Sequence, residues 1–279
     1  MIFKNILLIM FVFFCIKPVY NQTGVMDNYN LSINNSEQFE LASELNEISG
    51  IAATKDGRLF AHNDEEGFIY QLDPKSGKVM KYFYLGKEKV LNDFEGLAIE
   101  GVNFYLIASN GDLYSFFEQP DGKYSSYKKT NIGIDPSYNM EGLCYDPGTF
   151  SLLITCKENS GTEYPNSKVV FSYSLSQKKI DPEPRFIISI DELYNRFRIT
   201  DFSPSSIERH PIRDTFFILS SKEKAMIEVA KDGKILSGIK LSKKTHKKPE
   251  SITFDMNNNI LIGDEGKKGN ATLTKYNLE

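Results

Sequence analysis

The sequence predicts an all-β protein, a five-bladed β-propeller whose ring is closed by an N-terminal strand. Three observations predict it: a short phrase returns at intervals of 46, 46, 64 and 45 residues, each unit holds four strand-like segments, and the last unit lacks its outer strand. A period of this size is typical of radial or solenoid repeats. A six-bladed ring is the alternative, if the long third interval contains a further blade.

The repeated phrase defines where each blade begins. Its five copies span 47–52, 93–98, 139–144, 203–208 and 248–253. We call the third residue of each copy the register residue, and these are Ser49, Glu95, Glu141, Ser205 and Glu250.

The first unit shows the content of a blade. Segments rich in β-branched and aromatic residues alternate with Gly-, Asp- or Pro-containing turns, and they span 49–54, 58–63, 68–73 and 78–85. Four antiparallel strands in about 45 residues correspond to one propeller blade.

The fifth unit ends early. It has only three strands, predicted at 250–255, 260–264 and 271–277. We expect residues 37–45 to supply the fourth, because this pairing closes the ring and removes an open sheet edge. In the long third unit we predict a loop at 158–167 and a short helix over 191–197.

The chain is divided into a predicted signal peptide (1–21), a predicted disordered linker (22–36) and one propeller domain (37–279). Lys4 precedes an apolar stretch, Ile6 to Ile16, which is followed by Lys17-Pro18, as in a secretory signal. The stretch is shorter than the roughly 20 residues that span a bilayer. We therefore expect an exported protein that is periplasmic, membrane-associated or extracellular. Three fates of the N-terminal segment stay open: cleavage, lipidation at Cys15, or retention as a membrane anchor.

Composition favours a soluble β domain, with 41% hydrophobic and 13% aromatic residues. The net charge of −4 argues against a nucleic-acid partner, which requires a basic face. The basic run over 243–248 is interpreted as a solvated loop between the fourth and fifth blades, with contact to an anionic partner as the alternative. The expected partner is an unknown protein or a small-molecule ligand, and membrane association is a further option.

The two cysteines of the domain are predicted to be buried free thiols. If Cys144 lies opposite Leu153 in a hairpin, Cys156 lies about 10 Å away on the other face of the sheet, too far for a disulfide. The three histidines are isolated in the sequence and are expected at the surface, so no Ser-His-Asp arrangement is indicated.

The candidate site lies on the propeller axis. The first strand of each blade lines the central channel, so Glu95, Glu141 and Glu250 are expected to converge there. Carboxylates brought together retain a proton or bind a cation. Their hard oxygen atoms suit Ca²⁺ best and Mg²⁺ second. The alternative is that these side chains cap the backbone of neighbouring strands in a water-filled channel, and the residues alone do not decide between the two.

Polar residues at the ends of the second strands are expected near the same mouth of the channel, because adjacent strands run antiparallel. We predict that they surround the metal ligands as an outer shell of polar groups: Asp64, Asn110, Lys157, Glu158, Asp264 and Glu265.

Four segments together resemble the SdiA-regulated family of bacterial exported or membrane-associated propellers: 93–97, 139–143, 153–158 and 249–252. The resemblance covers 37–279. It implies a five-bladed propeller distantly related to NHL-repeat proteins, with a calcium site at Glu95, Glu141 and Glu250 and with Lys157 and Glu158 nearby. The sequence departs from the family pattern at Asn110-Gly111, where an acidic pair is expected.

Two functions follow as hypotheses. The first is an exported calcium-binding module that binds or scaffolds a ligand at the cell envelope, with no catalytic residues. The alternative is a calcium-dependent hydrolase of lactones or phosphoesters, with its active site at the channel mouth and Glu141 or Glu250 as the base. Propeller enzymes of that type resemble six-bladed rings with Asn and Asp ligands, which favours the first hypothesis.

Overall fold

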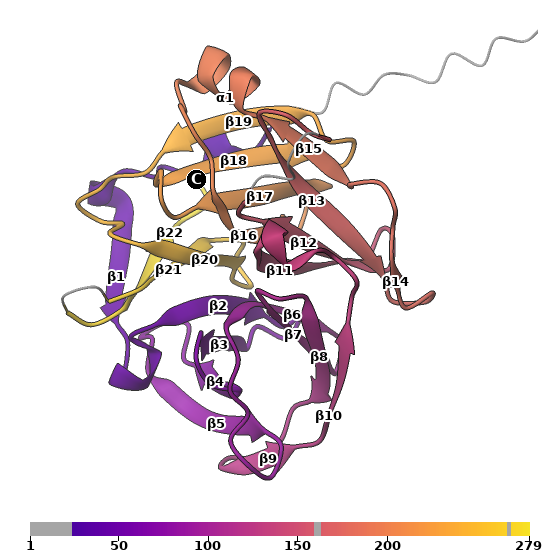
Figure 1. Cartoon of the computed structure of the whole chain (residues 1–279). Coiled ribbons are helices and arrows are strands. Elements are labelled where there is room, and N and C mark those ends of the chain that lie inside the picture. Colours follow the sequence, from indigo (N-terminus) through magenta and orange to yellow (C-terminus); the bar gives the residue numbers. More distant parts are fainter. Residues whose placement is uncertain (1–23, 159–162, 267–268) are drawn as a thin grey trace, which may run out of the picture.

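A computed structural model describes residues 24–158, 163–266 and 269–279 of the chain. Five β-sheets stand around a common axis, which confirms the predicted five-bladed propeller (Figure 1). The predicted signal peptide lies outside the described residues. Among the described residues, no helix has the length and hydropathy to cross a membrane.

The strands follow one another from the axis outward in each blade. Blade 1 contains β2 (Ile48–Ala53), β3 (Leu59–Asn63), β4 (Phe68–Leu72) and β5 (Val79–Leu85), with β9 (Lys123–Ser125) added parallel to β5. Blade 2 contains β6 (Phe94–Glu100), β7 (Asn103–Ala108), β8 (Asp112–Phe117) and β10 (Tyr127–Asn131). Blade 3 contains β11 (Met140–Asp146), β12 (Ser151–Cys156), β13 (Ser167–Ser174), β14 (Lys179–Ile180) and β15 (Phe186–Ser189). Blade 4 contains β16 (Pro204–Arg209), β17 (Thr215–Ser220), β18 (Ala225–Ala230) and β19 (Ile235–Lys240). Blade 5 contains β20 (Pro249–Phe254), β21 (Ile260–Asp264), β22 (Thr272–Tyr276) and β1 (Ser36–Glu40).

The innermost strands form a closed ring around the axis. Strand β2 contacts β6, and the contacts continue through β11, β16 and β20 back to β2. The hydrophobic core lies between adjacent blades. Between blades 1 and 2, for example, Phe60 packs edge-to-face on Phe104, with 5.0 Å between ring centroids. Such aromatic pairs stabilise the packing of one blade on the next.

The ring is closed by the N-terminal strand, as the sequence predicts. Strand β1 pairs antiparallel with β22, so that Ser36 lies opposite Tyr276 and Glu40 opposite Thr272. The strand is shorter than predicted, because a 3₁₀ turn, η3 (Ser43–Leu45), carries the chain inward toward β2.

The described residues of the long third interval form no extra blade, so the six-bladed alternative is wrong. Its additional residues form β15, which pairs with β13, and the helix α1 (Ile190–Phe197). Ser189 caps this helix by accepting a hydrogen bond from the backbone N–H of Glu192. The helix matches the predicted one within a residue, and a further 3₁₀ turn, η4 (Pro136–Tyr138), precedes β11. The predicted loop at 158–167 includes 159–162, which lie outside the described residues.

The predicted disordered linker differs from the structure from Gly24 onward. Residues 24–35 hold two 3₁₀ turns, η1 (Met26–Asn28) and η2 (Ile33–Asn35). Val25, Met26 and Tyr29 are buried in the core between blades 4 and 5. The buried Glu228 carboxylate accepts the backbone N–H groups of Val25 and Met26, at 2.8 and 2.9 Å. We call this segment the N-terminal arm.

The cysteines are buried free thiols, as predicted, and Cys144 lies opposite Leu153. Burial raises the pKa of both thiols, that of Cys156 to about 12. The prediction of surface histidines is wrong, because His62, His210 and His246 are all buried. His246 lies between Asp264, at 2.6 Å from Nδ1 to Oδ2, and the Tyr276 hydroxyl, at 2.8 Å from Nε2.

Candidate functional site

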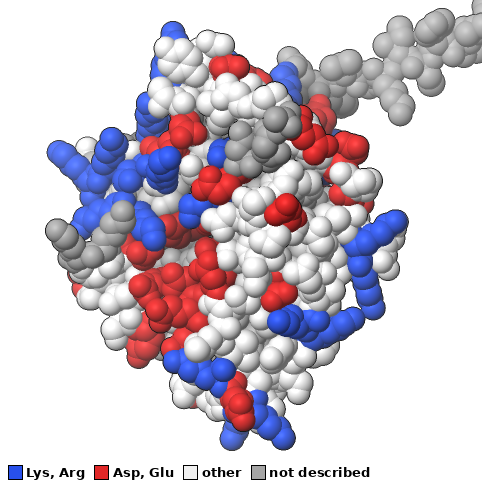
Figure 2. All heavy atoms as spheres, in the orientation of Figure 1, with Lys and Arg blue, Asp and Glu red and all other residues white. Residues whose placement is uncertain are grey.

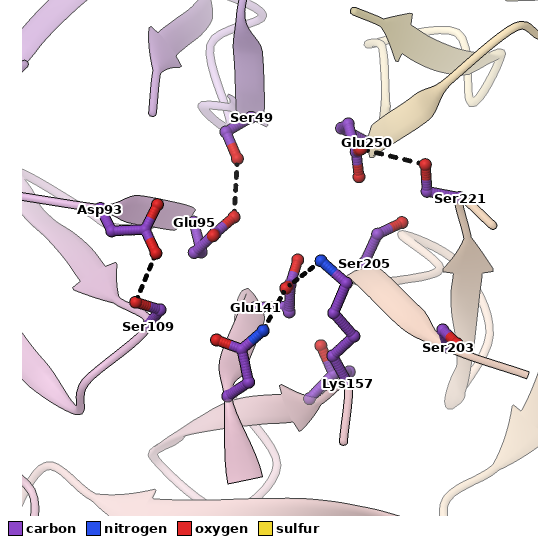
Figure 3. A network of polar contacts seen from close by, with 12 residues as sticks. Ser49, Asp93, Glu95, Ser109, Glu141, Lys157, Ser203, Ser205, Ser221 and Glu250 are labelled. Atoms are coloured by element: carbon purple, nitrogen blue, oxygen red, sulfur yellow. Dashed lines mark hydrogen bonds and ion pairs between the residues drawn. The ribbon is translucent and has the colours of Figure 1, made fainter. Parts of the chain in front are cut away.

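Each register residue occupies a β-bulge at the start of an inner strand. The pairing with the second strand shifts at Ser49, Glu95, Glu141, Ser205 and Glu250. A bulge inserts one extra residue and re-aims its side chain. Figure 3 shows these five side chains grouped around one centre, each from a different blade. The repeated phrase therefore encodes a local distortion that turns one side chain of each blade to the axis.

The residue after the register residue is small because the inner strands nearly touch. A Cβ atom on Gly96 would lie 2.6 Å from the carbonyl oxygen of Glu141, and one on Gly142 would lie 2.5 Å from the Cα of Ser206. Both contacts are with backbone, which cannot move aside as a flexible side chain can. Glycine at these two positions is thus a condition for closing the ring.

The three axial carboxylates have different partners. Glu95 accepts a hydrogen bond from the Ser49 hydroxyl at 3.0 Å. Glu141 pairs with the Lys157 ammonium at 2.7 Å. Glu250 accepts from the Ser221 hydroxyl at 3.0 Å and lies 3.3 Å from the Lys248 ammonium. Two of the three carboxylates therefore have a lysine beside them, and Glu95 has only a serine.

A small cavity of about 60 Å³ lies among these groups. It is lined by six carboxylates, two ammonium groups and two further residues: Glu47, Asp64, Glu95, Glu141, Glu250, Glu265, Lys157, Lys248, Ile48 and Ser49. We call this set the axial cavity. It brings together all three predicted metal ligands and, of the predicted outer shell, Asp64, Lys157 and Glu265.

The other three residues of the predicted outer shell do not line the cavity. Asn110 is exposed and accepts the backbone N–H of Asp112 in its own turn. Glu158 is exposed as well. Asp264 is buried and bound to His246 and to the backbone N–H of Lys248. These three positions of the predicted outer shell are therefore corrected by the structure.

Sequence reasoning missed a second ring of polar groups. Glu47 and Lys248 line the cavity, and Asn139 donates a hydrogen bond to Glu141 at 3.2 Å. Each lies two residues before a register residue. The signal was present in the sequence, because the first position of every repeated phrase is polar: Glu47, Asp93, Asn139, Ser203 and Lys248.

Burial and crowding of like charges raise the pKa values of the axial carboxyl groups. Burial, followed by the charges of Glu141 and Asp93, raises the pKa of Glu95 to about 9. Burial raises the pKa of Glu141 to about 7, although Lys157 opposes the shift. Burial also raises the pKa of Glu250, and that of Asp64 to about 6. The axial cavity therefore retains at least one proton at neutral pH, and Glu95 holds it most strongly.

The chemistry of the donor set suits a hard cation, but its arrangement does not yet form a metal site. Among the described residues, no group of three or more His, Cys, Asp or Glu side chains is placed to hold a metal ion. The Lys157 and Lys248 ammonium groups lie against the same carboxylates that a metal would need. Binding of Ca²⁺ would thus require both lysines to turn away.

Acidic and basic side chains lie in separate groups on the face of the molecule drawn in Figure 2. Figure 2 shows Asp and Glu side chains gathered in one patch at the left of the view and a group of Lys and Arg side chains above it. In the loop between β19 and β20, Lys243, Lys244 and Lys247 are exposed, whereas Thr245 and His246 are buried. The predicted solvated basic loop is therefore anchored by its central residues.

Solved structures with a similar fold are propeller-like and have low sequence identity. Glutaminyl cyclase of Myxococcus xanthus is 13% identical, with a TM-score of 0.59 over 87% of this chain and 94% of its own. A luciferin-regenerating enzyme is 10% identical, with a TM-score of 0.54 over 87% and 95%. A streptogramin B lyase is 12% identical, with a TM-score of 0.53 over 88% and 97%. These similarities concern the fold alone.

A family model matches nearly the whole described chain. The model of the SdiA-regulated family matches residues 21–269, which include all five repeated phrases and every residue of the axial cavity. The chain belongs to the SdiA-regulated family.

Proposed function

We propose that the axial cavity binds a cation, Ca²⁺ in the first place, and that the protein is an exported binding or scaffolding module at the cell envelope. The single observation that carries the proposal is the convergence of three bulge-held carboxylates, at Glu95, Glu141 and Glu250, in one cavity. Oxygen ligands of this kind are those that Ca²⁺ prefers.

The charges in the axial cavity support binding of a cation, which would compete for the carboxylates with a proton and with two lysine side chains. Glu95 carries a proton at neutral pH and has no lysine of its own. The Lys157 and Lys248 side chains are partly exposed, at 37% and 34%, so they are able to turn toward solvent. A divalent cation then supplies two of the three positive charges that the proton and the two ammonium groups bring to the cavity.

Thermal unfolding tests the proposal directly. We expect millimolar Ca²⁺ to raise the Tm of the purified protein above its value in excess EDTA, because a ligand that binds only the folded state stabilises it by mass action. At a free concentration about 100 times Kd, the gain is about 2.7 kcal/mol. Equal Mg²⁺ is expected to give a smaller shift. No shift with either ion contradicts the proposal, and equal shifts contradict selectivity for Ca²⁺.

A second candidate is the calcium-dependent hydrolase. The observation that favours it is the Glu141 carboxyl group, which has a pKa of about 7 and lies in the cavity beside Lys157. A general base is most effective when its pKa is near the working pH. The luciferin-regenerating enzyme, glutaminyl cyclase and lyase named above show that similar folds carry catalysis, without indicating a reaction for this chain.

This candidate predicts turnover of a lactone or phosphotriester that requires Ca²⁺. Glu141→Gln is then expected to reduce kcat/KM at least 100-fold, the usual size of a general base contribution. Glu158→Gln is the control, because Glu158 is exposed and outside the cavity. Absence of turnover across a broad panel, in a sample whose Tm responds to Ca²⁺, leaves the binding module as the function.

A further inference from the structure

A second cavity lies between the outer strands of blades 2 and 3, and it shares no residue with the axial cavity. Its volume is about 390 Å³, within the range of small-molecule sites. Blade 2 contributes residues of β7, β8 and β10, and blade 3 contributes the end of β13 and the turn after it. We call it the interblade groove.

The strand register explains which side chains reach the groove. Tyr105 of β7 lies opposite Ser115 of β8, which lies opposite Lys128 of β10. These three residues form a row on the face of blade 2 that is turned to blade 3. Lys129, the next residue, is on the other face, where it pairs with Asp112 at 3.1 Å. Alternation along β10 therefore places one lysine in the groove and the next outside it.

The groove has an aromatic lining. Tyr173 is buried at its floor with 5% exposure, and Tyr105 is half-buried beside it. Phe117 lines the wall and is 55% exposed. Aromatic rings in a concave site offer a flat apolar ligand a large contact area.

The charge of the groove is positive. Of the described residues that line it, Lys128 and Lys178 are the only charged ones. Both are exposed, and neither side chain forms an ion pair or hydrogen bond within the described part of the chain. The nearby carboxylate of Glu100 accepts a hydrogen bond from Asn103 at 2.6 Å and forms no ion pair with either lysine among the described residues. An anion in the groove therefore meets two ammonium groups that are not engaged in an ion pair.

We propose that the interblade groove binds a small soluble aromatic carboxylate or sulfonate. Its apolar body packs on Tyr105 and Tyr173, and its acidic group faces Lys128 and Lys178. The site is opposite in charge to the axial cavity and is built from different residues. It is thus a second binding function of the same propeller, and it does not depend on the cation site.

Fluorescence titration with 8-anilinonaphthalene-1-sulfonate, an aromatic sulfonate, tests the proposal. We expect saturable binding to the native protein, and we expect Lys128→Ala with Lys178→Ala to raise Kd at least 10-fold. Lys129→Ala is the matched control, since it removes the same charge from the other face of the strand, and Kd is expected to stay within twofold. The uncharged N-phenyl-1-naphthylamine should bind at least 10-fold more weakly than the sulfonate.

A groove-filling variant provides an independent check. Ser115→Phe places a ring in the groove without removing charge, and it should abolish saturable binding while the Tm in Ca²⁺ and in EDTA is retained. Equal Kd values for all lysine variants, equal binding of the uncharged dye, or unchanged binding by Ser115→Phe would each overturn the proposal.

Discussion

Replacing Glu95, Glu141 and Glu250 together by Gln is expected to abolish the rise in Tm that Ca²⁺ causes. Glutamine keeps the size of each side chain but loses the charge that a divalent ion requires. Within the described part of the chain, these three residues are the only carboxylates that β-bulges turn to the axis. Calorimetric titration with Ca²⁺ should show no binding by the variant at concentrations that saturate the unsubstituted protein.

The matched control removes the same charge elsewhere. Glu88, Glu158 and Glu279 are exposed and do not line the axial cavity, so their replacement by Gln should leave Ca²⁺ binding within about twofold. An unaltered Ca²⁺ response in the axial variant would refute the assignment of the site. It would also move the search for a cation site to the acidic surface patch of Figure 2.

The same variant should change how stability depends on pH. A carboxyl group whose pKa is higher in the folded than in the unfolded protein stabilises the fold below its unfolded value, and this contribution is lost as pH rises through the folded value. For Glu95 the window runs from 4.5 to about 9. In EDTA, the Tm of the unsubstituted protein should therefore fall relative to that of the Gln variant between pH 5 and pH 9. Calcium should restore it at pH 9, where the Glu95 proton competes less strongly with the cation than at neutral pH.

Gly142→Ala is expected to destabilise the propeller more than any exposed substitution. The new Cβ would lie 2.5 Å from the Cα of Ser206 and 2.7 Å from the backbone nitrogen of Ile207. Blades 3 and 4 must then separate at the axis, and overpacking of this kind costs about 1–3 kcal/mol. For a domain of this size, the Tm should fall by roughly 2–12 °C in thermal unfolding.

The control for this prediction is Gly269→Ala. A Cβ atom at Gly269 meets no atom within 4 Å, and its backbone does not have the positive φ that favours glycine. The Tm of the Gly269→Ala variant should stay within about 1 °C of that of the unsubstituted protein. If Gly142→Ala has the same small effect on Tm, the close contact between the inner strands does not determine the stability of the fold.

The blade count and the strands were readable from the sequence because they depend on local patterns. The period of the repeated phrase reports one blade, and turn residues such as Asp56-Gly57 mark the hairpins within it. Even the position of Cys144 opposite Leu153 follows from counting residues around one turn. The convergence of Glu95, Glu141 and Glu250 was predictable for the same reason, since every blade presents its first strand to the axis.

The surroundings of the carboxylates depended on contacts between distant parts of the chain. Asp264 ends the second strand of blade 5, and Asp64 directly follows that of blade 1, but Asp264 is bound by His246 from the loop between blades 4 and 5. Lys248 comes from that same loop and lines the axial cavity. The alternation of side chains along a single strand does not indicate which of them a loop residue will bind.

The N-terminal arm shows most clearly the difference between what local sequence patterns indicate and what contacts between distant residues decide. Val25, Met26 and Tyr29 have no helical or strand periodicity, so the sequence indicates a linker. They are held in place by contacts with blades 4 and 5. There, Glu228 accepts a hydrogen bond from the backbone N–H of Val25, from which it is 203 residues distant in the sequence. By itself, the sequence determined the repeat, the strands and the axial carboxylates, because these follow from local alternation and turns. Only the tertiary structure decided the lysine partners, the polar residues around the cavity and the packed arm, because these contacts exist only once the ring has closed.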